Sequence, residues 1–166
     1  MRCYLTTAAV AAALLGLPAY AYAQNPVPGK AAGAETMKST AAASLQWSPI
    51  QPEGFDAGME IAVIHGDPAV ADQPYTIRLR LKDGYRFPAH YHPKTENLTV
   101  LSGTFLLAMG ETASDNLQSY GPGDYLYLPP LQPHYGGAKG VTEVQLHGVG
   151  PFEIKLAKPG AAKSSK

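Results

Sequence analysis

Apolar and polar residues alternate along several short segments of this chain, and a two-residue period is typical of β-strands with one buried face. The alternation is clearest over residues 75–82, where Tyr75, Ile77, Leu79 and Leu81 are separated by polar residues. Turn-forming residues recur about every 8–12 positions, and no amphipathic helix of useful length follows residue 45. The sequence therefore predicts an all-β fold, an antiparallel barrel or sandwich, with one domain.

The remaining strands are predicted from the same pattern of short apolar runs bounded by glycine, proline and aspartate. The dipeptide Ser102-Gly103 is predicted to be the tight turn of a hairpin between two of them. These strands cover residues 59–64, 97–101, 104–109, 125–128, 141–147 and 152–156.

The first 23 residues have the three parts of a secretory signal peptide. Arg2 gives the positive start, residues 8–17 form the apolar run, and Ala21-Tyr22-Ala23 fits the small-residue cleavage site. The apolar run is shorter than the about 20 residues of a membrane span. We therefore expect cleavage before Gln24 and a periplasmic or secreted protein with no remaining membrane segment.

Composition divides the rest of the chain into three parts. Residues 24–44 are rich in Ala, Gly, Pro and Ser and are expected to form a flexible linker. Residues 45–156 hold the strands and are expected to form the folded β-domain, and residues 157–166 read as a disordered tail. The only cysteine, Cys3, falls within the signal peptide, so the mature protein has no disulfide and depends on its core for stability.

The charge balance gives no reason to expect a nucleic-acid partner. The chain has 13 Lys and Arg against 13 Asp and Glu, and removal of Arg2 with the signal peptide leaves 12 against 13. A protein with a net charge near −1 lacks the basic excess that binds a phosphate backbone.

Two histidines separated by one residue are the strongest functional signal. On a strand, His90 and His92 point to the same face, and the prolines that flank them place the pair where a strand meets a loop. Glu96 follows closely, and His134 comes from a later segment. Three imidazoles and one carboxylate are a usual ligand set for a divalent first-row metal ion. If they share an ion, residues 90–96 and residue 134 must lie close together, whereas an isolated His-x-His is more often a surface pair.

A second polar group lies along the predicted strand 141–147. One face carries Glu143, Gln145 and His147, and the other carries Thr142, Val144 and Leu146. If the polar face points inward, Gln145 and His147 become substrate-binding groups near the metal. If it points outward, they belong to an ordinary solvated face, and the pattern leaves both alternatives open.

The histidines belong to a longer motif that resembles the first signature of the cupin superfamily. Gly84 is followed by five residues, His90-x-His92, three residues, Glu96, six residues and Gly103. Gly123-Asp124, Pro129 and His134 approximate the second signature, although Leu131 stands where the family usually has glycine and Ala138 where asparagine often follows. The short spacer between the motifs is similar to that of small bacterial single-domain cupins.

This resemblance implies a β-barrel or jelly roll with a metal ion in its mouth. The ligands would be His90, His92, Glu96 and His134, and the ion would be iron, manganese, nickel, zinc or copper. The implied activity is that of a metal-dependent oxidoreductase, dioxygenase-like, which acts on a small organic molecule with Glu96 also as a catalytic base. The alternatives are a non-catalytic cupin that holds a metal or small ligand, and a cupin isomerase that uses Glu143 and His147. Small cupins often form homodimers, so a homodimer is also expected.

Overall fold

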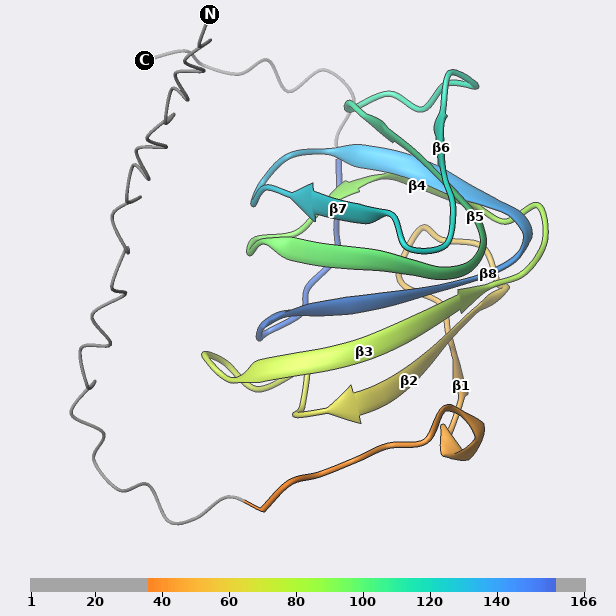
Figure 1. Cartoon of the computed structure of the whole chain (residues 1–166). Helices are drawn as coiled ribbons and strands as arrows, with labels where there is room; N and C mark the ends of the chain where they lie inside the picture. Colours follow the sequence, from red (N-terminus) through yellow and green to blue (C-terminus); the bar gives the residue numbers. More distant parts are fainter. Residues whose placement is uncertain (1–35, 158–166) are drawn as a thin grey trace, which may run out of the picture. The chain divides into compact units, whose positions relative to one another are not determined.

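The computed structural model describes residues 36–157 (Figure 1). The predicted signal peptide 1–23, residues 24–35 of the predicted linker and residues 158–166 of the predicted tail lie outside the described residues. Within the described part, the only helix is the three-residue 3-10 helix η1 (Ala42–Ser44), and the other regular elements are strands, which confirms the all-β prediction. No helix of this part has the length and hydropathy needed to cross a membrane.

All strand pairs are antiparallel and belong to one sheet. The path through the sheet is β1-β2-β3-β8-β4-β9, and β5 pairs with β6, β7 and β8. The strands of the described part are β1 (Ser48–Ile50), β2 (Met59–His65), β3 (Pro74–Leu81), β4 (Arg86–Tyr91), β5 (Glu96–Met109), β6 (Gln118–Tyr120), β7 (Tyr125–Leu128), β8 (His134–Val149) and β9 (Lys155–Leu156).

Strand β8 is the central strand of the sheet because it pairs with three other strands. Its second half pairs with β3 and its first half with β4, while its other edge pairs with β5 along most of its length. The sheet therefore curls around β8 into an open barrel (Figure 1). Gly136 and Gly137 lie in the crowded first half, where an added Cβ would overlap the carbonyl oxygens of Leu106 and Tyr85. Only glycine permits such close approach of the backbones.

The predicted hairpin at Ser102-Gly103 is wrong, since residues 96–109 form the single strand β5. The pairing of β5 with β8 changes register between Val100 and Ser102 and again between Ser102 and Thr104. Gly103 has a φ of 75°, and a Cβ there would overlap Thr142. The residue types that signal a tight turn also permit a β-bulge, and here they bend one strand around the barrel.

Two other strand boundaries differ from the prediction. Strand β8 begins at His134 instead of residue 141, because tertiary pairing makes a strand of a glycine-rich stretch with low strand propensity. Only Lys155–Leu156 of the predicted strand 152–156 form a ladder. Strand β7 has the predicted bounds.

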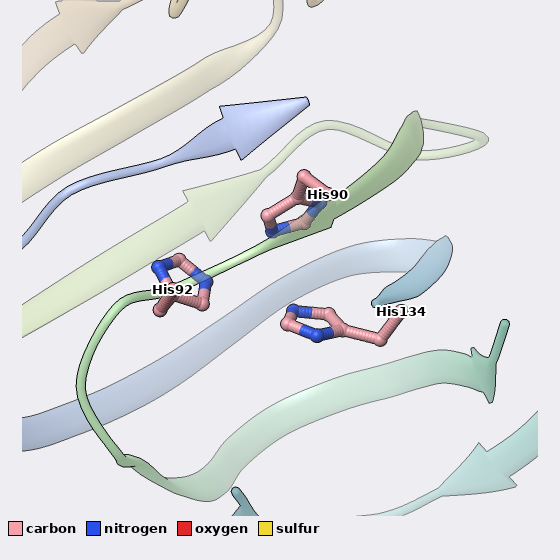
Figure 2. A group of neighbouring side chains, drawn as sticks. All are labelled: His90, His92 and His134. Carbon is pink, nitrogen blue, oxygen red and sulfur yellow. The ribbon is translucent and has the colours of Figure 1, made fainter. Parts of the chain in front are cut away.

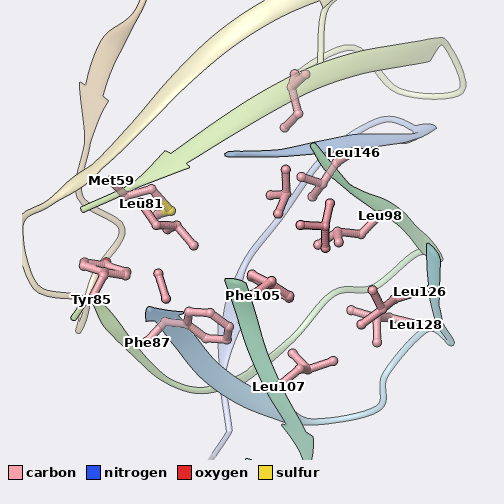
Figure 3. Close-up of a cluster of buried hydrophobic side chains, with 14 of the residues drawn as sticks. Met59, Leu81, Tyr85, Phe87, Leu98, Phe105, Leu107, Leu126, Leu128 and Leu146 are labelled. Carbon is pink, nitrogen blue, oxygen red and sulfur yellow. The ribbon is translucent and has the colours of Figure 1, made fainter. Parts of the chain in front are cut away.

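The hydrophobic core fills the inside of the curl (Figure 3). Ile77 and Leu81 of β3 and Val144 and Leu146 of β8 are almost completely buried. Burial of such a side chain contributes roughly 1.5–3 kcal/mol, and it fixes which face of each strand points inward. The labelled core residues of Figure 3 are Met59, Leu81, Tyr85, Phe87, Leu98, Phe105, Leu107, Leu126, Leu128 and Leu146.

Candidate metal centre

An irregularity in β4 turns His90 and His92 toward the interior. Phe87 is paired with β8 and buried, and the register shifts between Phe87 and His90. Pro88 lies within this shift, and its missing N–H cannot take part in a regular ladder. As a result His90 and His92 are both buried, and His92 lies just beyond the last residue of the strand, at the predicted junction of strand and loop.

The other two predicted ligands begin strands. His134 is the first residue of β8 and lies directly opposite His90 in the ladder, while Glu96 is the first residue of β5. Both are buried. The structure thus brings residues 90–96 and 134 side by side, as the sequence predicted.

The three imidazoles face one another in a compact cluster (Figure 2). One ring nitrogen from each of His90, His92 and His134 lies within 4.8 Å of the others. The Glu96 carboxylate adjoins two of them, with its Oε2 at 3.3 Å from Nε2 of His92 and 3.7 Å from Nε2 of His134. All four predicted ligands therefore converge on one small volume.

Backbone carbonyls fix the tautomer of every imidazole in the cluster. Nδ1 of His90 bonds to the carbonyl oxygen of Pro88 at 2.9 Å, and Nδ1 of His92 bonds to that of Glu153 at 2.8 Å. Nδ1 of His134 bonds to the carbonyl oxygen of Gln132 at 3.1 Å. A carbonyl oxygen only accepts, so each Nδ1 carries the hydrogen and each neutral ring keeps its lone pair on Nε2. This second-partner arrangement is typical of metal-ligating histidines.

Burial sets the protonation of the cluster in the metal-free protein. It disfavours the charged imidazolium, so it lowers the pKa of His90 to about 3 and the pKa of His92 to about 4. The pKa of His134 is also lowered, mainly by burial. Burial raises the pKa of Glu96 to about 7, against a smaller opposing effect of His134. At neutral pH the imidazoles are therefore neutral ligands, and a cation that binds here displaces a proton from a fraction of the Glu96 carboxyls.

These residues fit a divalent transition-metal ion. Nε2 of His92 is buried and has no hydrogen-bond partner among the described residues, although the Glu96 carboxylate lies 3.3 Å away. Two ligand atoms at about 2.1 Å from a shared ion lie about 3.0–3.4 Å apart in octahedral or tetrahedral geometry. The His92–Glu96 distance falls in that range, and the His134–Glu96 distance slightly exceeds it. Imidazole and carboxylate ligands suit several first-row metals, so the ligand set does not select one.

The cluster opens on a small apolar cavity of about 40 Å³. A water molecule needs roughly 10–15 Å³ of such space, so the cavity has room for about three water-sized ligands. In the part of the chain that the structure describes, its only polar or ionisable lining residues are the four predicted ligands. The apolar lining consists of Phe55, Met59, Leu79, Leu81, Phe87, Leu98, Phe105, Leu107, Leu128, Val144, Phe152 and Ile154.

Gln145 and His147 are not part of this cavity, so the outward-facing alternative holds for strand 141–147. Val144 and Leu146 of β8 point into the core, and His147 is exposed. Gln145 accepts a hydrogen bond from Arg78, and Glu143 forms ion pairs with Arg78 and Arg80. Burial of the apolar face decided between two alternatives that the alternation alone could not separate.

The sequence reasoning did not identify the aromatic residues that surround the histidines. Phe55 and Phe87 approach the His90 ring edge-on, with centroid distances of 5.1 and 5.5 Å. Phe152 stacks on the His92 ring with a centroid distance of 5.0 Å. Phe55 and Phe152 come from segments far from the motif, and no local pattern distinguishes them from other apolar residues.

The fold and the histidine cluster together define a cupin. The family model for the cupin domain matches residues 77–150, which include all four candidate ligands. The described residues form one small cupin domain, as the motif resemblance indicated. No curated protein matches the chain.

Solved cupin structures have the same fold at low sequence identity. The polyketide cyclase RemF from Streptomyces resistomycificus superposes with a TM-score of 0.63 at 15% identity, over 76% of this chain and 89% of that protein. A cupin 2 conserved barrel domain protein from Rhodopseudomonas palustris gives 0.56 at 15% identity, over 75% and 88%. A candidate acetylacetone dioxygenase from Methylibium petroleiphilum PM1 gives 0.57 at 16% identity, over 78% and 87%. At these identities the likeness shows the fold alone.

Proposed function

We propose that this cupin binds one divalent first-row metal ion through His90, His92, His134 and Glu96 and acts as a dioxygenase-like oxidoreductase on a small organic molecule. The observation that carries the metal site is the set of three backbone carbonyls that hold Nδ1 of every histidine, so that three Nε2 lone pairs are free for one ion. When bound, such an ion supplies a Lewis acid with an open position for an oxygen ligand.

The side chains around the ion have two tasks in this reaction class. Among the described residues, Glu96 is the only carboxyl group that lines the cavity, so it is the side chain that would accept a proton from a bound molecule when it leaves the ion. The apolar walls favour a small apolar ligand over a charged one. The fold shared with a candidate acetylacetone dioxygenase is compatible with this chemistry.

A non-catalytic metal-binding cupin is the second candidate, and the size of the cavity favours it. A volume of about 40 Å³ accepts water or a diatomic molecule but no larger organic substrate unless the lining moves. No residue of the lining other than the four ligands could act as an acid or base. The isomerase alternative required Glu143 and His147 as an acid–base pair beside the metal ion. Both residues lie outside this cavity, so nothing in its lining favours that alternative.

Metal content of purified protein tests the site. We expect about one equivalent of a transition metal per chain, and a sharp loss of occupancy in His90→Ala and His134→Ala. His65→Ala and His147→Ala are matched controls because both remove an exposed histidine outside the cluster. Equal metal content in all four variants would contradict the proposed ligand set.

Oxygen uptake by the metal-loaded protein separates the two candidates. The metal-loaded protein is mixed with a panel of small phenolic, carboxylic and diketone compounds. Oxygen consumption that is lost in His134→Ala supports the oxidoreductase hypothesis. Bound metal with no uptake across the panel supports the non-catalytic cupin.

We also propose that the protein acts in the periplasm or outside the cell, because its first 23 residues have the pattern of a signal peptide. Sequencing of the N-terminus of protein isolated from its native compartment should begin at Gln24. An intact Met1 in that fraction would contradict the proposed cleavage.

A further inference from the structure

The segment Pro151–Leu156 follows β8 and adjoins the metal cluster; we call it the C-terminal strap. Its β9 residues pair with β4, so that Leu156 lies opposite His90 in the ladder. At its other end the backbone N–H of Phe152 donates to the carbonyl oxygen of Pro68 at 2.7 Å. The strap is therefore held at both ends by backbone hydrogen bonds, and one end is attached to the strand that carries His90.

The three histidines differ in the origin of their orienting carbonyl. His90 and His134 each use the carbonyl two residues earlier in the chain, so the local backbone supplies it. His92 uses the carbonyl of Glu153, 61 residues later in the chain. Two ligands thus take their orienting carbonyl from their own stretch of backbone, whereas that of His92 comes from the strap.

The strap also packs against the His92 ring. Phe152 lies nearly parallel to the imidazole, with an interplanar angle of 16° and a centroid distance of 5.0 Å, and its other neighbour is Tyr75 at 5.8 Å. Phe152 and Ile154 both line the cavity. A ring held on its face by Phe152 and at Nδ1 by Glu153 has little freedom to turn its Nε2 away from the cluster.

We propose that the C-terminal strap is a positioning element of the metal centre, through the Glu153 carbonyl and the Phe152 ring that together orient His92. The proposal rests on metal binding by the four ligands. It predicts that docking of the strap raises metal affinity and that, by thermodynamic reciprocity, bound metal raises the stability of the docked strap. Release of the strap would leave the Nδ1 partners of His90 and His134 in place but remove that of His92.

Metal affinity of strap variants gives the first test. Loss of an outer partner of a metal-binding histidine typically weakens affinity about 10–100-fold. We expect Phe152→Ala to weaken Co²⁺ and Zn²⁺ binding about tenfold or more and to change the visible absorption of bound Co²⁺. Lys155→Ala is the matched control within the same segment, because its side chain is half exposed and pairs only with Glu153 among charged groups. We expect that variant to bind as the wild type does.

Hydrogen exchange of the wild-type protein gives the second test and needs no variant to fold. The N–H groups of Phe152 and Ala157 bond to the carbonyl oxygens of Pro68 and Ala89 and report strap docking. Addition of Zn²⁺ should slow their exchange by the same factor by which strap docking raises affinity.

Each outcome decides the proposal. Unchanged exchange at these amides, or Phe152→Ala with wild-type affinity, overturns the strap's role while leaving the metal centre in place. A wild-type protein that binds neither Co²⁺ nor Zn²⁺ overturns the proposed function and this inference together. If Phe152→Ala does not fold, the exchange measurement decides alone.

Discussion

Acid should destabilise the metal-free protein by at least about 1 kcal/mol per pH unit between pH 6 and 5. The folded-state pKa values of His90 and His92, about 3 and 4, lie below the ordinary 6.5, and that of His134 is lowered too. In this window the unfolded chain therefore binds about two protons, on His90 and His92, that the folded protein does not, and the lowered pKa of His134 adds to this difference, so stability is lost as pH falls. Glu96 has its pKa raised from 4.5 to about 7, so the folded state holds one proton that the unfolded chain lacks. The net difference is about one proton before the added effect of His134, and one proton is worth roughly 1.4 kcal/mol per pH unit.

Urea unfolding after chelation, repeated from pH 7 to pH 5, measures this slope, with the single tryptophan Trp47 as the fluorescent probe. His134→Ala should make the slope shallower, because it removes a histidine whose pKa is lowered by burial. Glu96→Gln should make it steeper by about one proton, because it removes the opposing group. A wild-type stability that stays constant from pH 7 to pH 5, or a shallower slope in Glu96→Gln, would refute the reasoning.

Two further predictions concern the backbone and the metal. Gly136→Ala should destabilise the protein by about 3 kcal/mol or prevent folding, because the added methyl group overlaps the carbonyl oxygen of Leu106, whereas Gly121→Ala, which meets no atom within 4 Å, should change urea stability little. A free metal concentration of 100 times the Kd should stabilise the folded protein by about 3 kcal/mol, and a chelator should remove this stabilisation. A melting temperature that does not change on chelation would contradict metal binding to the folded state.

The four candidate ligands could be predicted because their signal is local and chemical. His90, His92 and Glu96 are polar residues at fixed spacing between prolines and glycines, and the HxH spacing places two rings on one face whenever the backbone is extended. The position of His134 required only that a later strand return beside β4, which the structure confirms.

Other features depend on tertiary contacts and leave no comparable signal. The turn predicted at Gly103 is a bulge, because a glycine with positive φ serves equally well in both and only the pairing with β8 decides. Alternation gives the period of β8 but not its inward face, which is why Gln145 and His147 stayed undecided. The Glu153 carbonyl that orients His92 belongs to the backbone, and every residue type supplies one.

Without a metal ion, the cluster lowers the stability of the folded protein. The same features that lower stability make the cluster ready to bind a cation. A buried acceptor without a hydrogen-bond partner costs about 1–3 kcal/mol, and within residues 36–157 Nε2 of His92 has no such partner. Rotation of the ring could relieve this cost, yet the Glu153 carbonyl and the Phe152 ring hold it in place. The free energy of folding, and not that of metal binding, therefore holds the site in its binding geometry. An arriving ion meets neutral imidazoles that are already oriented, so little of its binding energy is lost to ordering the site.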